Sequence, residues 1–97
     1  MPGKRVDANH GEIRDDLRKI GYCVHDTSQY PGMLDLIVGA HGQLFWLEIK
    51  ASEKDKFTDK EQSIFDQFRG YPVLRVHSVE DALEQIKYWR TGHYADF

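Results

Sequence analysis

Three charged residues interrupt two apolar stretches in the middle of the chain. Asp35 lies in the first stretch, and Glu48 and Lys50 lie in the second. The break between the stretches, residues 40–43, is short and contains a glycine, which predicts a β-hairpin. Counting the pairs outward from that loop sets Asp35 opposite Glu48, and strand alternation puts Lys50 on the same face. The side chains on the other face are all apolar: Leu34, Leu36, Val38, Phe45, Leu47 and Ile49.

The expected grouping of two carboxylates and one lysine suggests a site for phosphate chemistry. Carboxylates directly opposed across a strand pair repel each other, and a divalent cation offsets that repulsion more fully than one lysine does. Mg²⁺ takes oxygen ligands and often uses only one or two protein carboxylates together with substrate phosphates. A bound ion lowers the pKa of its water, and a preorganised lysine stabilises developing negative charge. An ordinary cluster of ion pairs on a solvated sheet face explains the same spacing equally well.

Length and composition favour one small domain spanning residues 1–97. No apolar run approaches the ~20 residues that a membrane span needs, and no apolar segment follows the charges of the N-terminus, so we expect neither a membrane segment nor a signal peptide. The single cysteine, Cys23, suits a reducing compartment such as the cytoplasm and lies outside any zinc-site spacing. The C-terminal aromatics, Tyr94 and Phe97, are expected to cover a core edge or a partner subunit.

The net charge of −3 is unlike the basic footprint of most nucleic-acid-binding proteins. Local charge differs from that average, because residues 50–60 hold four lysines directly after the acidic pair. A bound metal ion would add further positive charge. The lysine-rich segment is either a solvated loop or a DNA contact. The residues that we name as candidate DNA contacts are Lys4, Arg5, Lys54, Lys56 and Lys60.

Hydrophobic spacing and turn residues predict three helices and four strands. The helices are expected at residues 8–20, 58–70 and 78–90, and the strands at 22–26, 32–39, 44–50 and 71–76. The resulting order is αβββαβα. The helical crossover from the third strand to the fourth predicts that these strands run parallel, either as neighbours or with one strand between them. We therefore expect an α/β fold with a mixed sheet and helices on both faces.

Helix starts and helix faces carry further predictions. Asn9 with Glu12, and Thr58 with Glu61, have the spacing of capping boxes. For Glu12 that cap is the structural explanation, and a place in a metal site is the functional one. Gln62 either faces solvent or reaches the acidic pair. The expected apolar stripes are Ile64, Phe65 and Phe68 in the second helix, and Val79, Ala82, Leu83, Ile86 and either Tyr88 or Trp89 in the third.

The hairpin residues resemble a known signature. Leu34-Asp35 followed by Glu48-Ile49-Lys50 is similar to the PD-(D/E)xK nuclease motif, and the order αβββαβ is the core of that superfamily. Residues 32–36 and 48–50, with Thr58 and Gln62 downstream, resemble specifically the VRR-Nuc family and its small stand-alone phage and bacterial members. The resemblance covers the chain from about Glu12 to the fourth strand. One departure is Leu34, which stands where the superfamily name has proline and is not a ligand position.

The resemblance implies a restriction-endonuclease-like core with an extra C-terminal helix, and a role for each motif residue. Asp35 and Glu48 would bind Mg²⁺ or Mn²⁺ with the Ile49 carbonyl as a third ligand, and Glu12 would complete the site. Lys50 would orient or activate the attacking water. No small-molecule cofactor beyond the metal is implied. The implied catalytic set, in which the last residue supplies an amide, is Glu12, Asp35, Glu48, Lys50 and Gln62.

The implied function is a metal-dependent, structure-specific DNA endonuclease in the cytoplasm of a bacterial or phage-infected cell. The stand-alone family members favour a Holliday-junction resolvase acting as a homodimer, because a two-fold dimer suits two opposed strands of branched DNA. The chain has no room for a separate base-reading domain, so specificity is expected to come from DNA shape and backbone contacts. Two alternatives stay open: a flap, nicking or restriction-like nuclease that needs a partner, and a non-catalytic DNA-binding module of the same fold.

Overall fold

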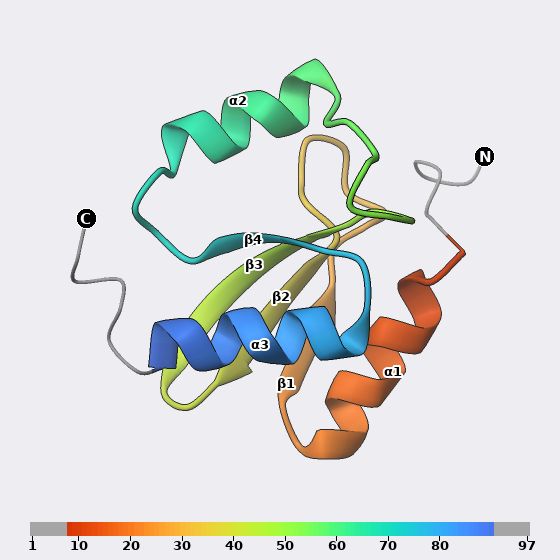
Figure 1. Cartoon of the computed structure of the whole chain (residues 1–97), viewed down its shortest axis with the longest axis vertical. Coiled ribbons are helices and arrows are strands. Elements are labelled where there is room, and N and C mark those ends of the chain that lie inside the picture. The colour runs from red at the N-terminus through yellow and green to blue at the C-terminus, as the bar shows by residue number, and fades with distance from the viewer. Residues whose placement is uncertain (1–7, 91–97) are drawn as a thin grey trace.

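Within residues 8–90, which the computed structural model describes, helices and strands follow one another in the predicted order αβββαβα (Figure 1). The helices are α1 (His10–Ile20), α2 (Asp59–Gln67) and α3 (Val79–Arg90), and the strands are β1 (Cys23–Asp26), β2 (Leu36–Ala40), β3 (Gln43–Ile49) and β4 (Val73–Val76). None of these helices has the length and apolar character that crossing a bilayer requires. The predictions for Lys4, Arg5, Tyr94 and Phe97 lie outside the described residues.

The β2–β3 hairpin has the predicted register with a tighter turn. Gly39 pairs with Leu44, as expected. The connection is a two-residue turn instead of a four-residue loop, and its residues, His41 and Gly42, have φ angles of 54° and 77°. Two successive positive φ angles are typical of the type I′ turns that join twisted strands. This register keeps the alternate apolar side chains on one face, and all of them are buried: Leu34, Leu36, Val38, Phe45, Leu47 and Ile49.

The four strands form one mixed sheet in the order β1-β2-β3-β4. The first three strands pair antiparallel, whereas β3 and β4 pair in parallel as direct neighbours. Parallel neighbours need a crossover connection, which α2 and its flanking loops supply. Of the two arrangements that the crossover allowed, direct pairing is therefore the one found, and the chain is an α/β domain.

The core lies between one face of the sheet and the helices α1 and α3. Figure 1 shows these two helices on the same side of the sheet, with α2 standing apart from both. The helical residues buried in this core are Ile13, Leu17, Ala82, Ile86 and Trp89. Of the two aromatic residues considered for α3, Trp89 is therefore the buried one, and Tyr88 is exposed.

Helix α2 lies against the opposite face of the sheet and buries little. Its predicted buried stripe of Ile64, Phe65 and Phe68 is wrong, because all three side chains are only half-buried and the helix has no buried residue. Phe68 packs edge-on against Trp46, with 5.8 Å between ring centroids, and Phe65 stacks on Phe57 at 4.5 Å. Aromatic contacts with Trp46 of β3 and with Phe57 of the preceding loop therefore hold this helix, without a shared core.

The start of α1 is fixed by a long-range contact. The capping box predicted for Asn9 and Glu12 is wrong, because the Asn9 side chain makes no hydrogen bond to the helix. Its amide donates instead to the carbonyl oxygens of Lys50, at 3.0 Å, and His77, at 2.9 Å. These residues follow β3 and β4 directly, so Asn9 ties α1 to the sheet edge where the predicted site lies.

Candidate functional site

Asp35 and Glu48 are both buried at the same end of the β2–β3 pair. Only 5% of Asp35 and 3% of Glu48 is exposed. The ladder stops at Leu36 and Leu47, one pair before the predicted pairing of the two acids. Beyond it the Asp35 N–H donates to the Leu47 carbonyl at 2.9 Å, and Asp35 Oδ2 accepts the N–H of Ile49 at 2.8 Å. The Asp35 side chain therefore reaches across to the β3 backbone next to Glu48.

Lys50 follows β3 and lies within ion-pair distance of two carboxylates. Its Nζ is 2.7 Å from Oε1 of Glu61 and 3.7 Å from Oε2 of Glu48. The side chains of Lys50 and Glu61 are only 12% and 16% exposed, so solvent screens their attraction weakly. The structure thus brings Glu48 and Lys50 together, as strand alternation predicts, and adds Glu61 from α2.

Glu61 is a site residue that the sequence reasoning missed. Its predicted capping box with Thr58 is confirmed: the Thr58 hydroxyl accepts the Glu61 N–H at 3.2 Å, and Glu61 Oε1 accepts the Thr58 N–H at 2.9 Å. Burial raises the pKa of Glu61, but hydrogen bonds with Glu48, Lys50 and the Thr58 N–H lower that pKa by a larger amount. The pKa of Glu61 therefore lies below its ordinary value. The available signal was its place in the first turn of the helix that follows the Lys50 strand.

The structure does not bring Glu12 or Gln62 to the acidic pair. Glu12 is exposed on α1, and Gln62 is exposed on α2, where its Nε2 donates to Asp66 at 3.0 Å. Successive residues of a helix point in different directions, so Gln62 faces outward because its neighbour Glu61 faces the sheet. Within residues 8–90 no group of three or more His, Cys, Asp or Glu side chains is placed to hold a metal ion. The carboxylate set that the motif implies is therefore not assembled here.

The acidic pair still has the donor chemistry of a site for a hard cation. Mg²⁺ and Mn²⁺ prefer carboxylate, carbonyl and water oxygens, and Mg²⁺ often uses only one or two protein carboxylates. Asp35 and Glu48 offer such oxygens away from bulk solvent, and the Ile49 N–H orients the Asp35 carboxylate. These residues fit an ion held by two carboxylates, with water or phosphate oxygens in the other positions.

The lysine-rich segment after β3 is an exposed loop that Arg75 of β4 anchors. The Arg75 guanidinium donates to the carbonyl oxygens of Glu53 at 2.8 Å and Ser52 at 3.1 Å, and also to that of Asp55. The parallel pairing of β3 with β4 places Arg75 beside Glu48 in the ladder. This anchor was not foreseen because it depends on that pairing. The candidate DNA contacts on and after the loop are all exposed: Lys54, Lys56 and Lys60.

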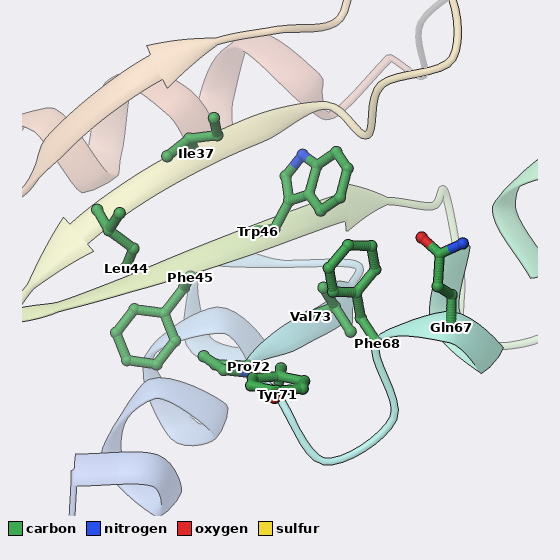
Figure 2. A pocket seen from close by; sticks show the side chains of 9 residues that line it. All are labelled: Ile37, Leu44, Phe45, Trp46, Gln67, Phe68, Tyr71, Pro72 and Val73. Atoms are coloured by element: carbon green, nitrogen blue, oxygen red, sulfur yellow. The ribbon is translucent and has the colours of Figure 1, made fainter. Parts of the chain in front are cut away.

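An apolar groove hollows the sheet face opposite the core, between β3 and the segment after α2 (Figure 2). Its volume is about 430 Å³. Figure 2 shows Phe68 next to Trp46 and Tyr71 next to Pro72. Leu44 is 69% exposed and Tyr71 is 66% exposed. The lining carries no charged residue and consists of Ile37, Leu44, Phe45, Trp46, Gln67, Phe68, Tyr71, Pro72 and Val73.

An ionic network on the core side joins α1 to the end of β1. Asp26 Oδ2 lies 3.0 Å from His10 Nε2 and accepts from Arg14 Nη1 at 3.1 Å, while Oδ1 accepts the hydroxyl and the N–H of Ser28. Burial raises the pKa of Asp26, but its bonds to Ser28, His10 and Arg14 hold that pKa well below the ordinary value. The network holds the sheet edge to α1, which is a structural role.

Together these features define a small α/β domain with a mixed sheet, a buried acidic pair and an adjoining lysine. Comparisons of the chain with family models, with curated proteins and with solved structures found no match. The function of the chain is therefore inferred from the geometry of the site and from the motif that the hairpin resembles.

Proposed function

We propose that this chain is a divalent-metal-dependent DNA endonuclease, a single nuclease domain with a restriction-endonuclease-like core. The observation that carries the proposal is that Asp35 and Glu48 are almost fully buried at one end of the sheet, with Lys50 within ion-pair distance of Glu48. A cluster of ion pairs on a solvated face, the other explanation of their spacing, requires exposed carboxylates. Burying carboxylates is unfavourable unless charge or hydrogen bonds compensate. The Ile49 N–H and Lys50 supply part of that compensation, and a cation held by the two acids would add to it.

In this proposal each site residue has a distinct task. Asp35 and Glu48 would hold Mg²⁺ or Mn²⁺, with the Ile49 carbonyl as the further ligand that the motif implies. The ion, when bound, supplies an activated water and polarises a phosphoryl oxygen. Lys50 would orient the attacking water and would stabilise the negative charge that develops on the phosphate. The exposed lysines of the loop contact the DNA backbone, which requires positive charge but no base recognition.

We further propose branched DNA, and a four-way junction above all, as the substrate of a homodimer. The apolar groove is the surface that we assign to a second copy, because aromatic residues are enriched in protein interfaces and its uncharged lining lets two copies of the same net charge meet. The exposed Leu44 and Tyr71 line this groove. In a two-fold contact the same patch of each copy meets that of the other, so the apolar side chains of one copy would pack against those of its partner. The single cysteine, a free thiol, suits the cytoplasmic setting that we propose.

The test is cleavage of a labelled DNA panel by the full chain. The panel contains a four-way junction, a flap, a splayed arm and a linear duplex, each with and without Mn²⁺. We expect cleavage of the junction that depends on the metal. Asp35→Asn and Glu48→Gln should each abolish this cleavage, and each should also abolish the heat of Mn²⁺ binding. Glu84→Gln, which changes an exposed glutamate of α3, is the matched control. Unchanged cleavage by Asp35→Asn would overturn the assignment of the metal site. Cleavage of the linear duplex as readily as the junction would overturn the assignment as a junction resolvase.

A DNA-binding module of the same fold without catalytic activity is the second candidate. It is favoured by the exposed position of Glu12 and by the lack, within residues 8–90, of a third acidic partner placed to hold a metal with the buried pair. Junction binding without cleavage under every metal condition supports this candidate. Cleavage confined to the flap substrate instead supports the flap-nuclease alternative.

A further inference from the structure

We propose that Glu61 is the positioning residue for Lys50, so that helix α2 sets the direction of the lysine that the reaction uses. This inference rests on the nuclease function proposed above. A lysine side chain is a flexible four-carbon stem, so its ammonium group needs a fixed partner to stay in one place. Glu61 Oε1, at 2.7 Å from Nζ, is a closer partner than Glu48 Oε2, at 3.7 Å.

The Glu61 carboxylate is itself held in place. The same oxygen that meets Lys50 accepts the Thr58 N–H at 2.9 Å, and the Thr58 hydroxyl accepts the Glu61 N–H at 3.2 Å. The capping box therefore fixes the carboxylate before Lys50 pairs with it. A helix cap, a carboxylate and the ammonium group form one continuous series of contacts that ends beside Glu48.

Because α2 is loosely packed, this ion pair contributes more to holding the helix than an exposed surface pair would. The helix has no buried residue. The side chain of Glu61, in its first turn, is only 16% exposed, and that of Lys50, which meets it from the end of β3, is only 12% exposed. An ion pair shielded from solvent is screened less by water and salt. The position of the ammonium group and the position of the helix start are therefore coupled through this contact.

Two substitutions separate positioning from capping. Glu61→Gln removes the charge that holds Lys50 but keeps a side-chain oxygen able to accept the Thr58 N–H. Thr58→Ala does the reverse, because it removes the hydroxyl that accepts the Glu61 N–H and keeps the carboxylate beside Lys50. A purely structural role of Glu61 predicts equal effects of the two changes. Positioning predicts the larger effect for Glu61→Gln, because Thr58→Ala keeps the backbone N–H that bonds the Glu61 carboxylate.

The first measurement follows amine acylation of the metal-free full chain, residue by residue, by mass spectrometry. In Glu61→Gln we expect Lys50 to be modified several-fold faster than in the original chain, because its ammonium group is no longer held in a shielded ion pair. Lys60, exposed on the same helix, serves as internal reference and should keep its rate. Unchanged Lys50 modification in Glu61→Gln, or an equal rise in Thr58→Ala, overturns the proposal.

The second measurement follows junction cleavage. Misplacing a catalytic group can lower a rate by up to about 100-fold, so we expect Glu61→Gln to lower kcat while junction affinity stays the same. Glu61→Asp should recover part of the loss. Lys50→Ala distinguishes failure of the proposed function from failure of the positioning role alone. If Lys50→Ala cleaves normally, the proposed function fails; if it is inactive but Glu61→Gln keeps the original kcat, only the positioning role fails.

Discussion

Asp35 Oδ2 accepts a hydrogen bond from the backbone N–H of Ile49, with 2.8 Å between the two atoms. Asp35 directly precedes β2, whereas Ile49 ends β3. Beyond the last pair of the ladder, this side chain satisfies a buried N–H that no strand partner reaches. Asp35 therefore has a structural task in addition to its proposed chemical one, and substitutions can separate the two.

Replacing Asp35 by alanine or by asparagine should give different stabilities and the same loss of activity. Asp35→Ala leaves the Ile49 N–H buried without this acceptor, which costs about 1–3 kcal/mol in the free energy of unfolding. Asp35→Asn retains an oxygen that can accept that N–H, so its stability should stay near the original. Urea denaturation of both variants measures the difference. Equal stabilities of the two would show that the N–H finds another acceptor.

Asp26 should make the domain sensitive to acid. Its folded-state pKa lies below the unfolded value of about 3.9, so its contribution is complete above that pH and is lost as the pH falls toward the folded pKa. Asp26→Asn should therefore lower the free energy of unfolding at pH 7 by about 1.5–3 kcal/mol, as expected for hydrogen bonds to a charged group.

The difference between Asp26→Asn and the original chain should shrink as the pH falls below about 4, because the Asp26 carboxylate of the unfolded chain is then protonated while that of the folded chain stays ionised. His10 and Arg14, which face Asp26 from α1, are present in both proteins. Denaturation curves at pH 7 and at lower pH provide the comparison. A difference that does not change with pH would contradict the assigned cause.

A charge in the apolar groove should separate the homodimer. Leu44→Glu places a carboxylate at its exposed edge, where two copies related by a two-fold axis would bring like charges together. We expect sedimentation analysis to show a dimer for the original chain and a monomer for Leu44→Glu. Ile20→Glu, at an exposed apolar residue of α1, is the control and should stay dimeric. A monomeric original chain would remove the homodimer from the proposal.

Arg75 should control the order of the lysine-rich loop. Its three bonds to loop carbonyls are lost in Arg75→Ala, so trypsin should cut at Lys54 and Lys56 sooner than in the original chain. Junction binding should weaken as well, because an unanchored loop must be ordered when DNA binds. Arg69→Ala, at an exposed arginine near the end of α2, is the control for the loss of one positive charge. Equal proteolysis of both variants would argue against the anchor.

Prediction from sequence succeeded where the determinants are local and failed where distant residues compete. The Thr58–Glu61 capping box formed because both partners lie within one turn. The same pattern at Asn9 and Glu12 did not form, because Asn9 bonds to carbonyls 41 and 68 residues away. A short-range pattern cannot show that a more distant acceptor will take its donor.

The sequence by itself determined the order of the elements, the pairing of Gly39 with Leu44 in the hairpin, and the position of Lys50 beside Glu48. Those properties follow from periodicity and turn chemistry within single segments. Only the tertiary structure decided that the two acids are buried, that Glu61 and not Gln62 meets Lys50, and that Glu12 stays exposed. Burial and ion pairing depend on how α1 and α2 are placed against the sheet, and that placement arises from contacts between segments far apart in the chain.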